Sequence, residues 1–238
     1  MLALITGSTG AALGERFPAV GRETPYGETS APVRQCQTSS GTPWLQLSRH
    51  GEQHLYAPHE INYLANLHAL KEAGATEVLA ICTVGSIDPT FEPGRWVVPD
   101  QLIDYTWGRP STFGGVTHSA PVNHIEFAEP FDAGLRERVV ALTGAASGGV
   151  YACTQGPRLE TAAEIRRLDR DGCTLVGMTA CPEAPLACEL GLPYALLCLV
   201  VNPAAGVGEI ISLEEISAVG RRGAEELEPL VDRFLDGG

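Results

Sequence analysis

The sequence predicts an α/β fold, and three observations support this class. Residues 194–201 form an almost continuous apolar run, which is typical of a parallel strand buried on both faces. Apolar residues recur at helical spacing over residues 58–73, and a buried strand-like run over residues 77–82 follows directly. Capping boxes at Thr161 and Ser212 mark where two further helices begin.

Length and charge narrow the class of protein. The chain has 238 residues and no composition break that would mark a linker, so we expect one domain over residues 1–238. The formal net charge of −13 repels nucleic acid and anionic membranes, and a phosphate site must therefore carry its own positive groups. No apolar run reaches the roughly 18 residues of a membrane span, and residues 1–10 lack the basic start of a signal peptide. We expect a soluble, cytoplasmic protein with no nucleic-acid or membrane partner.

The cysteine and histidine patterns do not indicate a metal centre. The seven cysteines contain no CxxC pair, and the six histidines form no HExxH-like cluster. Cys82, Cys153 and Cys198 lie within apolar, strand-like runs, where free thiols pack as small hydrophobic groups in a reducing cytosol. We expect neither disulfides nor a metal site.

The N-terminal third predicts two strands that end in polar loops. Leu2–Thr6 is a buried strand, and the glycine loop of residues 7–10 after it is consistent with either an anion-binding loop or a plain turn. Residues 24–32 predict a surface connection. The strand over residues 44–48 runs into Arg49-His50-Gly51, which could hold an oxyanion, although the tripeptide alone favours an exposed turn.

In the middle third, the helix over residues 58–73 is expected to end at Gly74. The strand over residues 77–82 precedes Thr83, Val84, Gly85 and Ser86, which places a hydroxyl and a glycine after a strand end. The remaining expectations are mixed strand and turn over 97–107, a mobile loop over 108–123 closed by His124, a short helix over 134–142 and a turn over 145–149.

The last third is expected to contain most of the ligand-binding loops. Val150–Cys153 is a strand, and Glu160 stands directly before the helix that begins at Thr161, where the helix dipole favours its carboxylate as an anion. It is either a ligand-reading carboxylate or an ordinary charged cap. The strand over residues 174–178 is followed by Thr179 and a helix. Asn202 follows the strand over 194–201 and fits either a ligand-reading amide or an Asn turn. The helix from Ser212 is amphipathic, with its inward residues at Ile216, Val219, Leu227, Leu230 and Phe234.

These strand-end residues occur in a specific order, although each motif alone is weak. The order is carried by the segments ITGSTG, LSRHG, CTVGSI, HIEFAEPF, GPRLETAAE, VGMTACPEAPLACELGLPYA and VVNPAAG. Together they cover most of the chain. They resemble the purine nucleoside phosphorylase family, and in particular its methylthioadenosine/methylthioinosine phosphorylase branch.

The resemblance implies a three-layer sandwich around a mixed, partly barrel-like β-sheet, assembled as a homotrimer with active sites near the interfaces. It implies inorganic phosphate as co-substrate and neither a metal nor an organic cofactor. The positions that match the family's phosphate site are Thr9, Arg49, His50, Thr83, Val84 and Thr179. Those that match its nucleoside site are Met178 along the sugar, His124 reaching the sugar of a neighbouring subunit, Leu213 near the 5′ end, and Leu159, Glu160, Asn202, Pro203 and Ala204 around the base.

Glu160 and Asn202 are the residues expected to act in catalysis and to select the base. A 6-oxopurine offers an N1–H donor to Glu160 and an O6 acceptor to the Asn202 amide, whereas a 6-aminopurine reverses both. Adenine-specific relatives carry Asp at the positions of Asn202 and Ala204 and a small hydroxyl at that of Glu160. Each mispaired buried group costs roughly 1–3 kcal/mol, so two give about a hundredfold discrimination. We expect a hypoxanthine-type base.

The 5′ end of the sugar is expected to meet an apolar wall. Residues Ile210, Ile211, Leu213 and Ile216 fill the region where the inosine/guanosine branch has a histidine, and no histidine follows His124. Burying an unpaired hydroxyl there is unfavourable, which favours a 5′-methylthio group. The expected reaction is phosphorolysis of methylthioinosine, and the alternatives are inosine/guanosine and methylthioadenosine phosphorolysis.

Two other classes of function remain open from the sequence. A nucleosidase would need a carboxylate base for water in place of a phosphate cradle, and Arg49 and His50 with Thr9 and Thr179 argue against it. A non-catalytic purine-binding protein would bind the ligand without cleaving it.

Overall fold

The computed structural model describes residues 1–9, 13, 17–114, 123–208 and 212–237, and it confirms the α/β class. Its strands are β1 (Leu2–Thr6), β2 (Ala19–Thr24), β3 (Gly27–Gln37), β4 (Pro43–Ser48), β5 (Glu77–Ser86), β6 (Trp96–Val98), β7 (Gln101–Asp104), β8 (Ala146–Ser147), β9 (Val150–Cys153), β10 (Leu175–Gly177) and β11 (Tyr194–Pro203). Its described helices are α1 (Tyr63–Glu72), α3 (Ala133–Thr143), α4 (Ala162–Arg170), α5 (Ala180–Glu189) and α6 (Leu213–Asp236).

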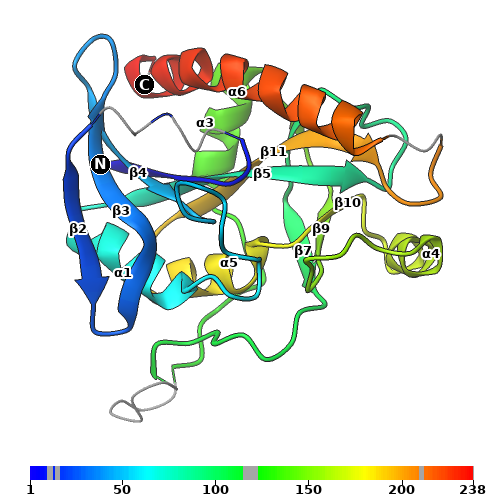
Figure 1. The fold of residues 1–238 in the computed structure, drawn as a ribbon, viewed down its shortest axis with the longest axis horizontal. Helices are drawn as coiled ribbons and strands as arrows, with labels where there is room; N and C mark the ends of the chain where they lie inside the picture. The colour runs from blue at the N-terminus through cyan, green and yellow to red at the C-terminus, as the bar shows by residue number, and fades with distance from the viewer. Residues whose placement is uncertain (10–12, 14–16, 115–122, 209–211, 238) are drawn as a thin grey trace.

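All the strands belong to one mixed sheet with helices on both faces (Figure 1). The order along the main path is β2-β3-β4-β1-β5-β10-β9-β7, while β11 pairs with β5 and β6, and β8 pairs with β6. β1 is parallel to both β4 and β5, and β5 is parallel to β11. β10 runs antiparallel to β5. β1, β4, β5 and β11 therefore all run in the same direction, and β1 ends beside the middle of β5.

Alternating side chains of the central strands divide the core into two apolar layers. Ile5, Ala80 and Leu196 face the layer that contains α1 and α5. Leu4, Ile81 and Leu197 face the layer that contains α3 and α6. Figure 1 shows the same arrangement, with α3 and α6 on one side of the strands and α1 and α5 on the other. The two-residue period of a strand explains the nearly continuous apolar sequences of β5 and β11, because both of their faces are covered.

The helix starts agree with their predicted caps. The side chains of Thr161 and Ser212 each accept a hydrogen bond from the backbone N–H three residues later. The carboxylates of Glu164 and Glu215 in turn accept from the backbone N–H of the cap residue. α1 is shorter than predicted, because it begins at Tyr63 after the Asn62 cap and residues 58–62 precede it outside the helix.

The predicted surface connection over residues 24–32 is wrong. Gly27 begins the long strand β3, and Tyr26 lies in the tight turn that joins it to β2. Gly27 has a φ of 98°, which explains why a glycine stands at this turn. The hairpin extends the sheet at the edge beyond β4, and Ser30 and Ala31 are buried in it.

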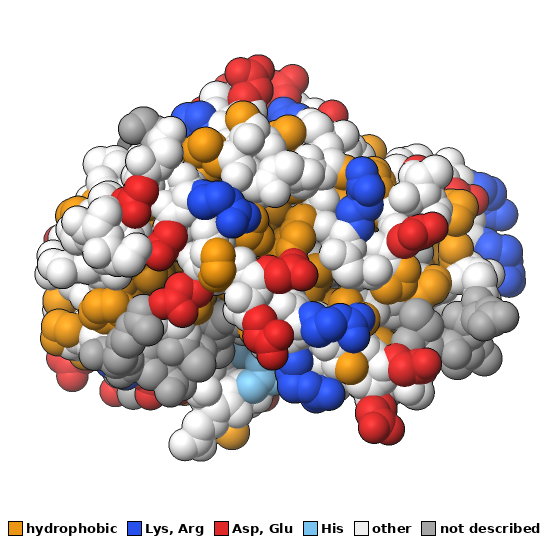
Figure 2. Space-filling view, turned by 90° about the horizontal axis from the view of Figure 1, so that it is seen from above, with side chains coloured by type: hydrophobic (Ala, Val, Ile, Leu, Met, Phe, Trp, Pro, Cys, Tyr) orange, Lys and Arg blue, Asp and Glu red, His pale blue; other side chains and the backbone are white. Residues whose placement is uncertain are grey.

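Acidic and basic side chains are scattered over one face of the molecule rather than separated into single-sign areas (Figure 2). Within the described residues, no helix combines the length and apolar character needed to cross a membrane.

Candidate active site

The site is built where two strands meet end to end on the same edge of β5. β11 pairs with β5 from Val78 to Ser86 and so occupies one whole edge. β1 pairs with residues 77–80 and β10 pairs with Gly85 and Ser86, so both must share the opposite edge. Residues 81–84 of β5 are left between their carboxyl ends. The loops that follow β1 and β10 enter this gap, as ligand-binding loops do at strand ends of α/β sheets.

Arg49 is buried beside the gap and is held in one orientation. Its Nε and Nη2 donate to the two carboxylate oxygens of Glu183 at 2.7 and 2.8 Å, and its Nη1 donates to the carbonyl of Ile81 at 3.1 Å. Tyr194 also donates to Glu183, at 2.8 Å. Burial alone would lower the pKa of Arg49, but the attraction of Glu183 outweighs it and raises the pKa well above the usual value. The guanidinium is therefore a permanent charge in a dry setting.

Two further hydroxyl groups belong to the loops that follow β1 and β10. Thr9 Oγ1 is buried, and it has no hydrogen-bond partner among the described residues. Thr179 follows β10, and its Oγ1 lies 3.5 Å from the Sγ of Cys82 on β5. An unpaired buried hydroxyl is unfavourable by about 1–3 kcal/mol, so Thr9 is placed as if to meet a ligand.

His50 is buried next to Arg49 and is uncharged at neutral pH. Its Nδ1 donates to the carbonyl of Tyr56 at 2.7 Å, since a carbonyl can only accept. Burial, followed by the nearby charge of Arg49, lowers its pKa to about 4. Nδ1 carries the ring proton, so Nε2 is a hydrogen-bond acceptor. His50 therefore brings no positive charge to the site in this state.

Thr83 and Val84 do not follow β5, as predicted, but belong to it. The strand continues to Ser86 because β11 pairs alongside it to Pro203. Thr83 is half-buried and Val84 is buried, and both lie in the segment of β5 that β1 and β10 leave open on one edge.

The predicted base-reading groups lie close to the carboxyl end of β5. Asn202 belongs to the end of β11, beyond a register shift between Val200 and Asn202. Its Nδ2 donates to the carbonyl of Pro203 at 2.6 Å, which leaves the second N–H of the amide. Ala204 N–H donates to the carbonyl of Ser86 at 2.7 Å. The register shift is the kind of irregularity that re-aims a side chain.

Glu160 reaches the same region from the loop before α4. Its Oε1 accepts from the hydroxyl of Thr154 at 2.6 Å, and the carboxylate is half-buried. A Cβ added to Gly206 would lie 2.8 Å from the Cβ of Ala162, so the loop after β11 touches the first turn of α4. The loop that follows Asn202 and β11 is therefore in contact with the start of the helix that follows Glu160.

The remaining predicted site residues are Met178, Leu159, His124 and Leu213. Met178 is half-buried between β10 and α5, with its sulfur over Gly156. Leu159 is 56% exposed, and His124 is exposed. Ile210, Ile211 and the side chain of Leu213 lie outside the described residues.

Sequence reasoning missed two charged residues at this site. Glu183 is the lone carboxylate in the apolar stretch of residues 180–188, a signal that a buried cationic partner exists elsewhere in the chain. Arg109 falls in the segment that was predicted as a mobile loop, and its sequence context gives no comparable signal. Its guanidinium donates to the carbonyls of Gln155, Met178 and Cys181 at 2.7–2.8 Å.

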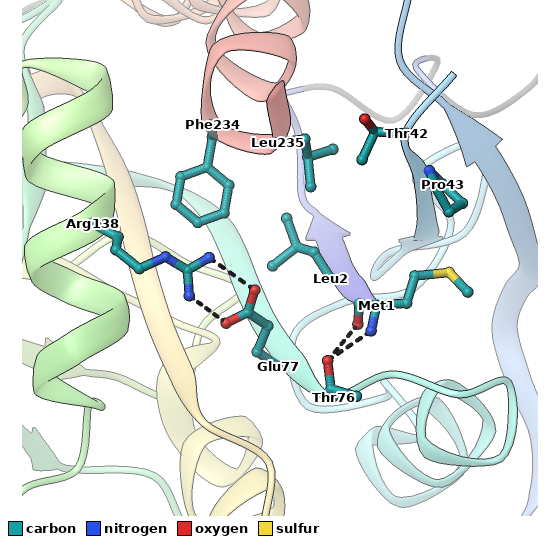
Figure 3. Close-up of a pocket in the computed structure, with 9 residues that line it drawn as sticks. All are labelled: Met1, Leu2, Thr42, Pro43, Thr76, Glu77, Arg138, Phe234 and Leu235. Atoms are coloured by element: carbon teal, nitrogen blue, oxygen red, sulfur yellow. Dashed lines mark hydrogen bonds and ion pairs between the residues drawn. The ribbon is translucent and has the colours of Figure 1, made fainter. Parts of the chain in front are cut away.

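Two surface hollows lie away from this site. One, of about 510 Å³, is lined by Met1, Leu2, Thr42, Pro43, Thr76, Glu77, Arg138, Phe234 and Leu235 (Figure 3). These residues include the amino ends of β1, β4 and β5, so the hollow lies at the opposite end of these strands from the site. Arg138 is already paired with Glu77 there, at 2.8 and 3.0 Å. The other hollow, of about 260 Å³, is lined by residues of β2, β3, β4 and α1.

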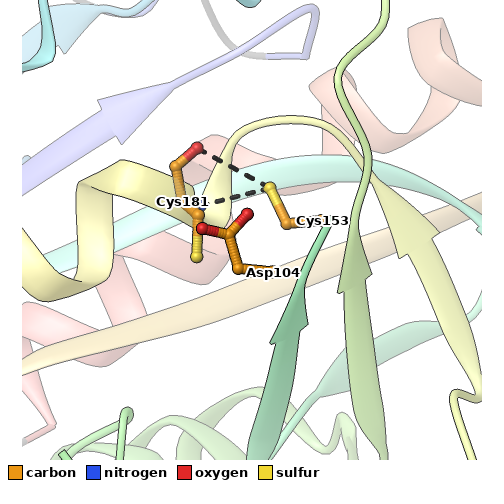
Figure 4. Close-up of side chains that lie close together, drawn as sticks. All are labelled: Asp104, Cys153 and Cys181. Carbon is orange, nitrogen blue, oxygen red and sulfur yellow. Dashed lines mark hydrogen bonds between the residues drawn. The ribbon is translucent and has the colours of Figure 1, made fainter. Parts of the chain in front are cut away.

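Asp104, Cys153 and Cys181 gather beside α5, with ligand atoms within 4.8 Å of one another (Figure 4). The thiol of Cys153 accepts from the Cys181 N–H at 3.2 Å and donates to the Cys181 carbonyl at 3.7 Å. The bond with Cys153, followed by burial, raises the pKa of Cys181, and a thiol must lose its proton to bind a metal. The local bonds and the raised pKa of Cys181 describe two packed side chains, with the Cys181 thiol protonated.

The chain is similar to known proteins over nearly its whole length. The phosphorylase superfamily matches residues 2–236. A probable S-methyl-5′-thioinosine phosphorylase of Xanthomonas campestris is 51% identical over 205 residues, covering 83% of this chain and 81% of the relative. Its counterpart in Pseudomonas syringae is 48% identical over 218 residues, covering 89% and 88%. The methylthioadenosine phosphorylase of Schistosoma mansoni, solved with adenine, has a TM-score of 0.89 at 28% identity and covers 99% of this chain and 90% of its own.

Proposed function

The chain belongs to the phosphorylase superfamily, and from this premise we propose that it cleaves S-methyl-5′-thioinosine with phosphate. The products are hypoxanthine and S-methyl-5-thio-α-D-ribose 1-phosphate. The observation that carries the proposal is the buried Arg49, fixed by Glu183 at the gap in the edge of β5. The loop after β1, which approaches Arg49 at Gly7, also carries the buried Thr9 hydroxyl, which has no partner among the described residues. The substrate is supported by the relatives at 48–51% identity that carry this activity in their names.

Phosphate is assigned to the residues around the gap. Arg49 offers five N–H groups, of which three meet Glu183 and Ile81, so others remain for an anion. Thr9, Thr83, the backbone of Val84 and Thr179 add donors. Neutral His50 contributes an acceptor nitrogen, which suits the remaining proton of HPO₄²⁻.

The base is assigned to Glu160 and Asn202. Glu160 accepts from N1–H, and the second amide N–H of Asn202 donates to the O6 or N7 side of a 6-oxopurine. Pro203, Ala204 and Leu159 complete the pocket wall.

The reaction follows from these positions. A phosphate oxygen bonds to C1′ while the bond from C1′ to the purine breaks, and the proton of HPO₄²⁻ balances the proton that the free base gains. Negative charge develops on the departing base, where the Asn202 N–H stabilises it more strongly than in the bound substrate. Such donors act strongly because the site is dry.

The sugar is assigned to Met178, with Leu213 towards the 5′-methylthio group and His124 of the partner subunit completing the site. This assignment requires a homotrimer. Exposed apolar side chains at Leu55, Trp107 and Leu159 support a subunit interface. The seven free cysteines, six of them buried, fit action in the reducing cytoplasm.

Two close alternatives share the same chemistry. An inosine/guanosine phosphorylase would need a polar partner for the 5′-hydroxyl. A methylthioadenosine phosphorylase is supported by the fold of the Schistosoma mansoni enzyme, which binds adenine. It would require the pairing of Glu160 and Asn202 with the base to be wrong.

A substrate panel with and without phosphate tests the proposal. We expect methylthioinosine to have a higher kcat/KM than methylthioadenosine, inosine, guanosine and adenosine, with no turnover in phosphate-free buffer. In the Asn202→Asp, Ala204→Asp double variant we expect the preference to move towards methylthioadenosine. Turnover without phosphate would show a hydrolase, and binding without cleavage would show a purine-binding protein.

A further inference from the structure

Arg109 connects two loops that carry different parts of the proposed site. Its Nη1 donates to the carbonyls of Met178 and Cys181 at 2.8 and 2.7 Å, both at the junction of β10 with α5, where Cys181 has a non-helical backbone. Its Nη2 donates to the carbonyl of Gln155 at 2.8 Å and to that of Thr154 at 3.4 Å, in the loop after β9. Each terminal amino group thus donates to one loop, and the rigid guanidinium fixes the distance between the two loops.

The side chain is held without an ion pair in the described part of the chain. A fifth oxygen, the phenol of Tyr63, lies 3.4 Å from Nη1, and the guanidinium carbon lies 5.8 Å from the centre of the Tyr63 ring. The Nε–H is buried and has no partner among the described residues. The two terminal amino groups therefore make all of its described hydrogen bonds, and four of the five go to main-chain carbonyls of the two loops.

Three of these four carbonyls belong to residues at or near proposed substrate contacts. The hydroxyl of Thr154 bonds to Glu160, the base-reading carboxylate, at 2.6 Å. Met178 carries its own side chain along the sugar. Cys181 lies between Thr179 and Glu183, and Glu183 is the residue that orients Arg49. The bonds of one guanidinium therefore reach the base, sugar and phosphate regions.

We infer that Arg109 is a positioning residue for the nucleoside, which holds the base-reading loop at a fixed distance from the loop that carries sugar and phosphate contacts. This inference rests on the proposed function for the identity of those contacts. Arg109 acts through Thr154, Met178 and Cys181, and no substrate contact is assigned to it. Lysine cannot replace it, since one ammonium group does not present two separated donor pairs to two loops.

The test compares Arg109→Gln, Arg109→Lys and Arg109→Ala with the wild type, using methylthioinosine and methylthioadenosine at saturating phosphate. We expect each variant to raise the nucleoside KM about tenfold or more, because small displacements of a bound substrate cost that much. We also expect the ratio of kcat/KM for the two nucleosides to move towards one. Millimolar guanidinium chloride should restore part of the activity to Arg109→Ala and none to the wild type. Arg138→Gln, an arginine remote from the site, should keep wild-type kinetics.

A fall in kcat with an unchanged nucleoside KM and an unchanged selectivity ratio would overturn the inference, since loss of folded protein has that signature. Wild-type behaviour of Arg109→Gln would overturn it as well. If Arg109→Ala fails to fold, Arg109→Lys provides the same two readouts. Failure of the proposed function can be distinguished from failure of this inference, because the wild type would then prefer a different nucleoside. The Arg109 variants are then compared with the wild type on that nucleoside.

Discussion

At the scale of single residues, the pair of Arg49 and Glu183 governs how an acidic protein can bind an anion. The pair is bidentate, and its side chains are 1% and 0% exposed. A buried pair of this kind contributes little net stability relative to apolar residues, but removing one partner is strongly destabilising. The role of the pair in this site is to orient the Arg49 guanidinium. The carboxylate fixes the guanidinium beside the gap in the edge of β5, and Tyr194 fixes the carboxylate.

Replacing one partner of the pair tests this account. We expect Glu183→Gln to lower the free energy of unfolding by about 3 kcal/mol or more, since the Arg49 charge loses its buried counterion. The phosphate KM should rise because the guanidinium is held less firmly. Glu77→Gln removes a matching bidentate bond to Arg138 at the surface, and we expect a loss below about 1 kcal/mol. The free energy of unfolding of both variants is measured with urea. Equal losses in the two variants would contradict this account of the buried pair.

The neutral state of His50 has a consequence for stability at acid pH. The pKa of His50 is about 4 in the folded chain against an ordinary value of 6.5. Between these values the unfolded chain binds the proton and the folded chain does not, so stability is complete above pH 6.5 and falls towards pH 4. The expected contribution is about 1.4 kcal/mol per pH unit in this window.

The measurement is urea unfolding at several values between pH 7 and pH 4.5. His50→Gln should show a shallower loss of stability than the wild type, and the variant of the exposed His59, His59→Gln, should follow the wild type. If His50→Gln loses stability as steeply as the wild type, His50 is not the group responsible.

At the scale of elements, α6 is positioned by close contact with β11. A Cβ added to Gly223 would lie 2.2 Å from Cδ2 of Leu199, a buried residue of β11. A Cβ added to Gly220, one turn earlier, would meet only Thr9 Oγ1, at 3.8 Å. Both glycines are inside the helix, so each substitution to alanine gains the same helix propensity, about 1 kcal/mol. The difference between them isolates the packing.

We therefore expect opposite effects from two similar substitutions. Gly220→Ala should raise the free energy of unfolding by up to about 1 kcal/mol, and Gly223→Ala should lower it by about 1–3 kcal/mol as Leu199 is displaced. Thermal and urea unfolding are the measurements. A stabilised Gly223→Ala protein would show that α6 can move away from β11 at little cost.

The elements that could be predicted from the sequence are those with local signals. β1, β9, α4 and the start of α6 agree with their apolar runs and capping boxes. The hairpin of β2 and β3 was missed because the residues of its turn also favour a surface connection, and only pairing with β4 reveals the strand. Thr83 and Val84 were placed after β5 for a similar reason, since β11 decides where β5 ends.

The site was predictable only in part, for the same physical reason. Arg49, Thr9 and Thr179 could be named because each follows a strand, and the structure places Arg49 and Thr179 beside residues 81 and 82 of β5. Glu183 bonds to Arg49, which is 134 positions away, and Arg109 bonds to carbonyls up to 72 positions away. No local sequence pattern identifies partners at such distances.

At the scale of the whole molecule, the exposed apolar side chains are unevenly distributed around the site. Trp107, which is 74% exposed as a residue, follows β7, and its backbone N–H donates to the side-chain oxygen of Gln155 in the loop after β9. Leu159, in the loop before α4, is also exposed. Large apolar groups exposed next to a binding site indicate a surface that a partner covers. A second copy of this chain is the partner that the proposed homotrimer requires.

Light scattering decides the assembly. We expect the wild type to have a molar mass about three times 25.2 kDa. Trp107→Asp should shift the mass towards the monomer, because a carboxylate in an apolar interface is strongly unfavourable. Its kcat/KM should fall with the loss of trimer, because His124 of the partner subunit then no longer completes the sugar site. Val20→Asp introduces the same charge at an exposed apolar position on β2, at the opposite end of the sheet, and should leave both mass and activity unchanged. A monomeric wild type with full activity would exclude the shared site, and the sugar contacts would then have to come from a single chain.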